Sequence, residues 1–358
     1  MTGELYINGR FLTRPMTGVE RFAYHICKAM AELQLPFTII CPKARIQDCY
    51  DVNGLNIIRF GRGNSHLWEQ CILPFFFIGK KDDVIVSFTG LGPVLISHKV
   101  MTIHDLSFLE HPGWFSKAYY WWYKMMTPLA VKTSQHIITV SDFSKQEILR
   151  WYPFVRPDHI CVARNATDSR LFRQLAQDNK PAQRFMLAVA SMDPRKNFSR
   201  LVEAFKEISD CHLYIVGNSH RAFNKNGNDT KAYDNIHYLG RVSDEELVRL
   251  YNEAVGFISP SLYEGFGLPL LEAMSCGCPV LASDIPASRE VCGNAALYFD
   301  PHDTDAIRQA IVHFLTLSDE DRQALQTAGL ENAKRFSWTD AAQAIINLVK
   351  GKSPSDTI

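Results

Sequence analysis

The chain has 358 residues, of which 46% are hydrophobic and 21% are charged, the balance of an ordinary folded protein. This composition excludes disorder, collagen and coiled coil for the chain as a whole, and at roughly 100–200 residues per domain the length predicts two domains. The net charge is zero, but residues 1–180 carry 21 Lys and Arg against 15 Asp and Glu, and residues 181–358 carry 17 against 23. The opposite signs predict two domains with different partners. The modest basic excess comes without an RNA- or DNA-reading motif, so we expect no nucleic acid partner.

Short apolar segments alternate with helical patterns along the first half. The predicted strands are 5–8, 37–41, 56–60, 84–88, 100–103, 136–140 and 160–163. A helix is predicted over 19–33, between the first two of these strands. Strands that alternate with helices favour a parallel sheet built from right-handed crossovers.

The second half repeats the pattern. The predicted strands are 185–190, 212–216, 236–239, 256–259, 279–282 and 297–299, and the predicted helices are 198–208, 244–254, 303–315 and 338–349. Two such series predict an α/β fold with two doubly wound Rossmann-like domains, which we expect to face each other across a ligand cleft at the carboxyl ends of their strands. The polar, proline-containing stretch 171–183 is typical of a linker, so the domains are predicted as 1–172 and 183–336.

Cysteine usage and apolar runs bear on location and metal binding. Nine scattered cysteines do not form a disulfide pattern, and the pair Cys276 and Cys278 has no second pair at zinc spacing, so we expect reduced core thiols and no metal site. The longest apolar run, 72–79, is far too short to span a bilayer, and the first eleven residues do not resemble a secretory signal. These features predict a cytoplasmic protein.

The segment 259–286 holds the most informative motif. The predicted strand 256–259 is followed by Glu264, a Gly-Phe-Gly turn, and a Leu-Pro pair that opens a helix carrying Glu272. Proline suits the first turn of a helix, and glycines let the backbone approach a ligand closely. Because the start of a helix attracts anions, the segment predicts a diphosphate site. Two carboxylates would flank it, with Glu272 in the first helical turn; a glycine turn with solvated glutamates is the alternative.

A second motif, Ala-Ser-Met-Asp-Pro-Arg-Lys-Asn at 190–197, follows a predicted strand and precedes the helix 198–208. Its adjacent Arg195 and Lys196 lie at the carboxyl end of that strand, where they suit a pair of phosphates: Arg through its bidentate fork and Lys as a point charge. A solvated turn is the alternative reading.

Glu264 and Glu272, with seven residues between them that include GFGLP, resemble the signature of the retaining glycosyltransferases of family 4, which have the GT-B fold. Five further segments resemble other motifs of that family: 190–205 (ASMDPRKNFSRLVEAF), 238–243 (YLGRVS), 102–107 (TIHDLS), 139–144 (TVSDFS) and 336–338 (FSW). The resemblance covers essentially residues 1–350, and the motifs are specific only when taken together.

The resemblance implies a role for each matching residue. At the catalytic centre it implies Glu264 and His104. For the donor sugar it implies Glu264, Gly265, Phe266 and Gly267. For the donor phosphates it implies Arg195, Lys196, Gly18, Gly267 and Leu268. For the ribose and base it implies Glu272, Arg241 and Val242. It also implies that the first domain, 1–172, is the acceptor side and that the second, 183–336, binds the nucleotide sugar. The terminal helix, 337–350, is implied to cross back to the first domain.

The implied reaction moves a sugar from a nucleotide diphosphate sugar to a hydroxyl group with retention of configuration. The nucleotide sugar is a substrate, and no cofactor is expected. Arg195, Lys196 and the helix start at Gly267 would stabilise the charge of the leaving diphosphate, which makes a metal unnecessary, and the sequence has no DxD motif. Without a second carboxylate placed as a nucleophile, a front-face route is expected, in which the leaving phosphate takes the acceptor proton.

The acceptor is predicted from segment 111–126 (HPGWFSKAYYWWYKMM), which mixes lysines with aromatic residues as interfacial segments do. With the basic first half, it favours contact with an anionic membrane surface; a helix packed partly in the core is the alternative. Many family members extend polyprenyl-diphosphate-linked oligosaccharides for surface polysaccharide or lipopolysaccharide, which implies such an acceptor and O-antigen synthesis here. A nucleotide-sugar epimerase and a non-catalytic two-lobed sugar-binding protein are the other functions considered.

Overall fold

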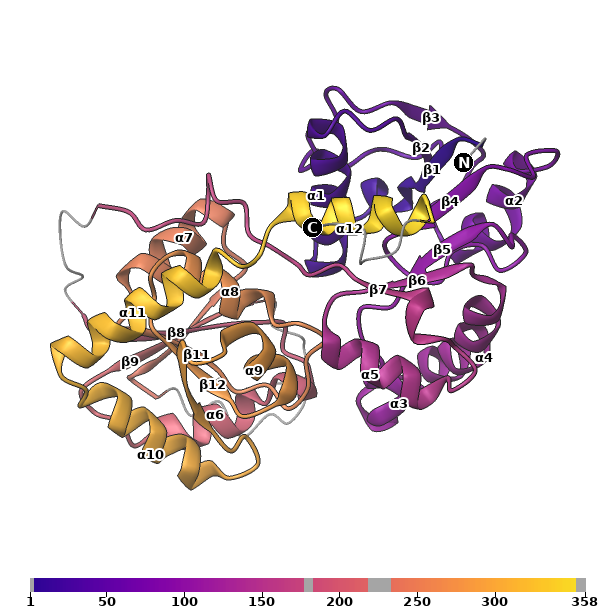
Figure 1. The fold of residues 1–358 in the computed structure, drawn as a ribbon. Helices are drawn as coiled ribbons and strands as arrows, with labels where there is room; N and C mark the ends of the chain where they lie inside the picture. Colours follow the sequence, from indigo (N-terminus) through magenta and orange to yellow (C-terminus); the bar gives the residue numbers. More distant parts are fainter. Residues whose placement is uncertain (1–2, 177–182, 218–232, 352–358) are drawn as a thin grey trace. The chain divides into compact units, whose positions relative to one another are not determined.

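The computed structural model describes residues 3–176, 183–217 and 233–351, and these form two compact units (Figure 1). The first unit combines Met1–Asn165 with Ser337–Ile358, and the second is Ala166–Phe336. Residues 166–172, which the sequence analysis assigned to the first domain, therefore belong to the second unit. Part of the predicted linker, 177–182, lies outside the described residues.

The first unit is built on a seven-stranded parallel sheet in the order β3-β2-β1-β4-β5-β6-β7. Its strands are β1 (Leu5–Asn8), β2 (Thr38–Cys41), β3 (Ile57–Arg59), β4 (Val84–Ser87), β5 (Lys99–Thr102), β6 (His136–Thr139) and β7 (Ile160–Val162). Strands β4 and β5 are buried along their whole length, as expected for a parallel sheet covered by helices on each face, whereas the edge strand β3 is largely exposed.

Helices of the first unit pack against that sheet. They are α1 (Gly18–Glu32), α2 (Leu73–Phe76), α3 (Ser107–Glu110), α4 (Lys117–Thr133), α5 (Asp142–Trp151) and α12 (Trp338–Val349), with short helical turns at Gly9–Thr13, Trp68–Ile72, Pro112–Trp114 and Pro157–His159. The terminal helix α12 packs along α1 and reaches β6 and β7 (yellow in Figure 1). The Trp338 ring stacks on His25 of α1, with centroids 5.1 Å apart.

The second unit is a six-stranded parallel sheet in the order β10-β9-β8-β11-β12-β13. Its strands are β8 (Phe185–Val189), β9 (His212–Val216), β10 (Ile236–Gly240), β11 (Gly256–Ser259), β12 (Val280–Ser283) and β13 (Ala296–Phe299). Its helices are α6 (Phe198–Phe205), α7 (Asp244–Glu253), α8 (Leu268–Ser275), α9 (Pro286–Cys292), α10 (Thr304–Leu315) and α11 (Asp319–Ala333), with a short turn at Pro194–Lys196. Helices α6 and α10 pair on one face of the sheet, and α8 pairs with α11 on the other (Figure 1).

The fold class expected from the sequence is confirmed: two doubly wound Rossmann-like units. Every predicted strand is present, with ends within one residue of the prediction. The helix predicted over 198–208 ends earlier, at Phe205.

The cysteine prediction is only partly right. All nine cysteines are free thiols and most are buried, but Cys49 and Cys71 are exposed and lie outside the core. No helix among the described residues combines the length and the apolar character needed to cross a membrane.

Candidate functional site

The two motif segments meet because of the strand order in the second unit. Strands β8 and β11 are neighbours, and the chain order reverses between them. Open α/β sheets bind ligands outside the carboxyl ends of strands at such a switch point. The loops that leave these two strands are 190–197 and 260–267, and the N–H of Leu262 donates to the carbonyl oxygen of Arg195 at 2.7 Å. The topology therefore brings the basic pair and the glycine turn to one place.

A buried charged cluster lies at this switch point. The Nζ of Lys196 donates to Oε1 of Glu264 at 2.5 Å, and the Ser261 hydroxyl donates to the same oxygen at 2.7 Å. Arg195 Nη1 is 4.0 Å from the other carboxylate oxygen. Glu264 and Lys196 are each only 8% exposed. Burial alone would raise the pKa of Glu264, but the Lys196 and Arg195 charges outweigh burial and hold that pKa below its usual range, so the carboxylate is ionised at neutral pH.

Asn197 positions this cluster, a role that no sequence motif indicated. Its backbone is left-handed, with φ 58°, and its side-chain amide donates to the carbonyl oxygens of Pro260 at 3.1 Å and Pro301 at 2.8 Å. It thereby ties the loop after β8 to the loops after β11 and β13. An Asn directly before a helix indicates an N-cap, yet this side chain makes no capping hydrogen bond to α6. The available signal was therefore misleading.

The glycine turn leads into helix α8 as expected. Gly267 precedes the helix with φ 98°, a conformation that favours glycine, and a Cβ there would lie 2.9 Å from the Leu270 side chain. Pro269 occupies the first turn, where its missing N–H leaves no hydrogen bond unmade. Leu268 is the first helical residue, and Phe266 is buried with its ring 5.6 Å from that of Phe336.

The expectation that Glu272 lies in the first helical turn is wrong. Because α8 begins at Leu268, Glu272 is its fifth residue and lies in the second turn. Its buried carboxylate accepts a hydrogen bond from the Tyr251 hydroxyl of α7 at 3.1 Å. Burial and the Glu272 charge raise the pKa of Tyr251 well above its usual value, so its hydroxyl stays a donor. No sequence motif pointed to Tyr251.

The other predicted donor residues follow the edge strand. Arg241 and Val242 come directly after β10, and β9 separates β10 from β8. At strand spacing this places them roughly 10 Å from β8 across the sheet. The Arg241 side chain is exposed. The structure thus leaves both residues apart from the buried cluster but at the same edge of the sheet.

The two predicted residues of the first unit are linked through helix α1. Gly18 is the first residue of α1, and a Cβ there would meet no atom within 4 Å. His104 follows β5, and its Nε2 pairs with the carbonyl oxygen of Phe88 at 2.8 Å. The Phe22 ring of α1 packs edge-on against His104, with centroids 5.2 Å apart. Burial lowers the pKa of His104, so its ring is neutral at pH 7.

Comparison with protein families matches both halves of the chain. The family described as Glycosyltransferase Family 4 matches residues 16–171, and Glycosyl transferases group 1 matches residues 172–332. The chain is similar to O-antigen chain mannosyltransferase B of Escherichia coli, with 33% identity over 72% of this chain and 71% of that protein. It is also similar to O-antigen chain mannosyltransferase RfbU of Salmonella typhimurium, with 32% identity over 88% of this chain and 92% of that protein.

Solved structures share the fold at low sequence identity. Sucrose-phosphate synthase from Thermosynechococcus elongatus superposes with a TM-score of 0.76 at 19% identity, covering 98% of this chain and 99% of that chain. WaaG, a glycosyltransferase involved in lipopolysaccharide biosynthesis, gives a TM-score of 0.73 at 16% identity, covering 97% of this chain and 99% of that chain. Two matched domains in sequence and two Rossmann-like units in space make this chain a glycosyltransferase of family 4 with the GT-B fold.

Proposed function

We propose that this glycosyltransferase moves a mannosyl group from a nucleotide diphosphate mannose to a hydroxyl of an oligosaccharide acceptor in O-antigen synthesis, with retention of configuration and without a metal. The sugar and the pathway are inferred from the names of the two O-antigen mannosyltransferases that it resembles along most of their length. The observation that carries the reaction type is the buried cluster of Arg195, Lys196 and Glu264 beside the start of α8.

The cluster suits a leaving diphosphate. As the bond between the sugar and the phosphate breaks, negative charge grows on the phosphate oxygens, and fixed cations lower the energy of that state. Lys196 is held in place by Glu264, and the start of α8 at Leu268 contributes the positive end of the helix dipole. These groups give a cationic and backbone cradle that supports metal-independent departure of the phosphate.

The proposed route to retention uses one face of the sugar. The acceptor oxygen bonds to the anomeric carbon on the side from which the diphosphate departs, and the bond between that carbon and the phosphate oxygen breaks. The acceptor proton passes to the departing phosphate oxygen, which leaves a nucleoside diphosphate and a lengthened acceptor. One oxygen of Glu264 already accepts two hydrogen bonds, so we assign Glu264 to sugar hydroxyls and not to nucleophilic attack.

The remaining donor contacts follow from position. The Glu272 carboxylate, fixed by Tyr251, is proposed to accept hydrogen bonds from the ribose hydroxyls. Arg241 and Val242 are proposed to lie near the base, at the same edge of the sheet. Further contacts to sugar and phosphate are proposed for Gly265, Phe266, Gly267, Leu268, Gly18 and His104.

Contact with an anionic membrane is proposed for helix α4. Its inner face buries Thr127, Ala130 and Val131, while Trp121 and Met125 are 56% and 62% exposed. Lysines accompany these apolar side chains: Lys124 lies over the rings of Tyr120 and Trp121. Exposed aromatic residues with lysines match the interface between lipid headgroups and acyl chains. The sequence left two readings of this segment open, a membrane-facing helix and a helix packed partly in the core, and α4 has one face of each kind. The exposed face supports a polyprenyl-diphosphate-linked acceptor at the cytoplasmic face of the membrane.

A transfer assay tests the reaction. Purified protein is incubated with GDP-, UDP- and dTDP-mannose and a lipid-linked acceptor, with and without EDTA. Products are analysed by mass spectrometry and by the one-bond NMR coupling between the new anomeric carbon and its proton. We expect one donor to be used, EDTA to have no effect, and the product to keep the donor configuration. Conversion of the donor without an acceptor would indicate an epimerase, and binding without turnover would indicate a sugar-binding protein; both functions are disfavoured by the mannosyltransferase relatives.

Variants test the assigned cluster. Lys196→Ala and Glu264→Ala should each lower kcat by more than about 100-fold, the loss typical of removing a group that stabilises transition-state charge. Lys206→Ala is the matched control, because Lys206 forms an exposed pair with Glu203 in the same unit at 2.5 Å. Near-normal turnover of Lys196→Ala would remove the assignment. For the membrane, sedimentation with anionic liposomes should occur at low salt and weaken at high salt; no binding at either would exclude the contact.

A further inference from the structure

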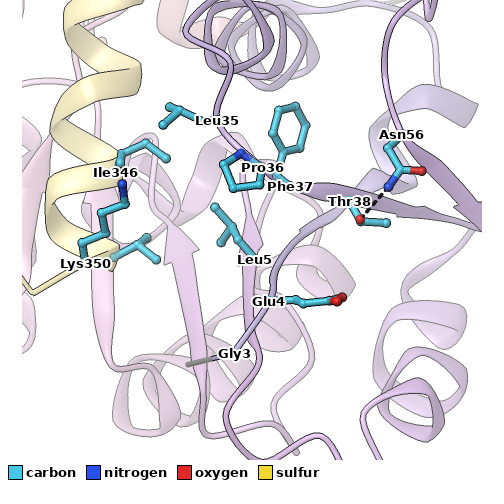
Figure 2. A pocket seen from close by; sticks show the side chains of 11 residues that line it. Gly3, Glu4, Leu5, Leu35, Pro36, Phe37, Thr38, Asn56, Ile346 and Lys350 are labelled. Carbon is cyan, nitrogen blue, oxygen red and sulfur yellow. Dashed lines mark hydrogen bonds between the residues drawn. The ribbon is translucent and has the colours of Figure 1, made fainter. Parts of the chain in front are cut away.

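A pocket of about 470 Å³ lies within the first unit, at the amino ends of β1 and β2 (Figure 2). Its walls come from the first residues of these strands, from the turn that joins α1 to β2, and from the last turn of α12. His104 follows the carboxyl end of β5, at the other edge of the sheet. Because β1 has four residues, roughly 13 Å of strand separates the two edges. The pocket is therefore distinct from the residues proposed for sugar transfer.

Apolar side chains make up most of the lining. They are Leu5, Leu35, Pro36, Phe37, Ile346 and Val349. Ile346 is buried, but the other five are only half-buried or are exposed. The volume is within the range of small-molecule sites, and an apolar ligand that covers these side chains gains free energy by removing them from water.

Most polar side chains of the lining are already paired. The Asn56 amide donates to the Thr38 hydroxyl at 2.8 Å, drawn as a dashed line in Figure 2. One oxygen of Glu4 accepts from the Tyr6 hydroxyl at 2.5 Å, and the Nζ of Lys80 donates to that same hydroxyl at 3.0 Å. The walls thus offer little to the many hydrogen-bonding groups of a sugar, a nucleotide or a peptide, whose burial without partners is unfavourable. They suit a hydrocarbon body.

Lys350 supplies a charge at the solvent-facing edge of the pocket. Its side chain is exposed and forms no hydrogen bond or ion pair with the part of the chain that the structure describes. Figure 2 shows Lys350 on the α12 wall beside Ile346, whereas the Glu4 carboxylate points away from it. A lysine ammonium on a flexible stem complements an anionic group held next to apolar surface.

We propose that this pocket binds a free amphiphile of the long-chain carboxylate class, with its hydrocarbon chain against the apolar walls and its anionic head group at Lys350. A bound chain would pack between α12 and the amino ends of β1 and β2. The membrane contact proposed for α4 is a separate surface, because α4 contributes no residue to this pocket. The site goes beyond the proposed function and does not depend on it.

The test measures binding of decanoate below its critical micelle concentration, by isothermal titration calorimetry and saturation-transfer NMR. We expect one decanoate per wild-type chain, with saturation reaching its methylene protons. Decyltrimethylammonium has the same chain and the opposite charge, so it should bind about fivefold more weakly or less, the range of an exposed ion pair.

Two variants separate the chain from the head group. Val349→Phe places a ring in the pocket and should weaken decanoate binding at least tenfold. Lys350→Gln leaves the apolar walls intact and should remove most of the preference for the anionic amphiphile; because Lys350 is exposed, this variant should fold normally. Lys43→Gln is the matched control, because Lys43 is exposed beyond the carboxyl end of β2, away from the pocket. It should change neither affinity.

Several results would overturn the proposal. They are an absence of decanoate binding to the wild type, undiminished binding in Val349→Phe, or equal affinity of the wild type for the two amphiphiles. Val349→Phe should also sediment with anionic liposomes as the wild type does; a loss would mean that the pocket takes a bilayer lipid and not a free amphiphile. No measurement here uses a nucleotide sugar, so failure of sugar transfer would overturn the proposed function alone.

Discussion

Replacing Lys196 by Met leaves the Glu264 carboxylate buried without its nearest cation, which lies 2.5 Å away. Removing one partner of a buried ion pair costs about 3–5 kcal/mol, because the remaining charge is desolvated and uncompensated. Arg195, 4.0 Å away, and the Ser261 hydroxyl still stabilise the carboxylate, so we expect a loss near the low end, about 3 kcal/mol. Met has a similar volume, which keeps the packing change small.

The loss should depend on pH in a defined direction. In the wild type the pKa of Glu264 lies below its ordinary value of 4.5, so the stabilisation is present above that value and fades as pH falls through the lowered pKa. Without Lys196, only Arg195 and Ser261 oppose the effect of burial, so the pKa of Glu264 is higher in the folded variant than in the folded wild type. The variant therefore loses stability relative to the wild type as pH rises through the interval between those two pKa values. The gap between the two proteins should be small at acid pH and reach its full size once Glu264 is ionised in both.

The positions of the tryptophans allow the stability of each unit to be measured separately. All six tryptophans belong to the first unit, so tryptophan fluorescence follows its unfolding, and far-UV circular dichroism follows both units. At a slope of about 2 kcal/mol per molar urea, a loss of about 3 kcal/mol moves the second-unit midpoint down by about 1.5 M. The fluorescence midpoint should not move.

A double-mutant cycle supplies the control. Lys196→Met with Glu264→Gln removes both charges, so the double variant should be more stable than Lys196→Met alone. Two results would refute the reasoning: a circular dichroism midpoint for Lys196→Met equal to that of the wild type, or a double variant whose loss equals the sum of the two single losses.

Four further outcomes follow from other contacts. Asn197→Ala should lower the free energy of unfolding of the second unit, read by circular dichroism, by about 3 kcal/mol, because two hydrogen bonds are lost and alanine disfavours the left-handed backbone. Asn197→Gly should recover part of that loss. Tyr251→Phe should raise the donor KM about 3- to 10-fold at constant kcat, because Glu272 loses the donor that orients it. Trp338→Ala should lower the free energy of unfolding of the first unit, read from the fluorescence of the other tryptophans, by about 2 kcal/mol. Because burial lowers the pKa of His104, first-unit stability should decline below pH 6.5 in the wild type, and His104→Gln should flatten that decline between about pH 6.5 and 5.

The strands were predictable because each is a short apolar segment, and central ones such as β4 and β12 are buried on both faces of a parallel sheet. The helix start at Gly267 was also predictable, since the glycine turn and Pro269 act locally. The placement of Glu272 in the first turn was wrong although the helix start was right, because Glu272 is the fifth residue of α8 and one turn holds only 3.6 residues.

Contacts between distant segments were beyond reach of the sequence. Lys196 and Glu264 are 68 residues apart, and their pairing depends on β8 and β11 being neighbours in the sheet. Tyr251 reaches Glu272 from a different helix. A pocket beside His104 forms because α4 packs over the ends of β4 and β5, and the spacing of residues along the chain does not predict that packing.

The first unit takes its last helix from the far end of the polypeptide. A fragment that stops at Asn165 would therefore uncover the side of α1 against which Trp338 packs, and it should aggregate or unfold. The same arrangement governs hybrid enzymes made to exchange donor preference between relatives. Such chimeras should take 166–336 from one parent and both 1–165 and 337–350 from the other. Helices α1 and α12, which pack against each other, then come from the same parent and keep complementary surfaces.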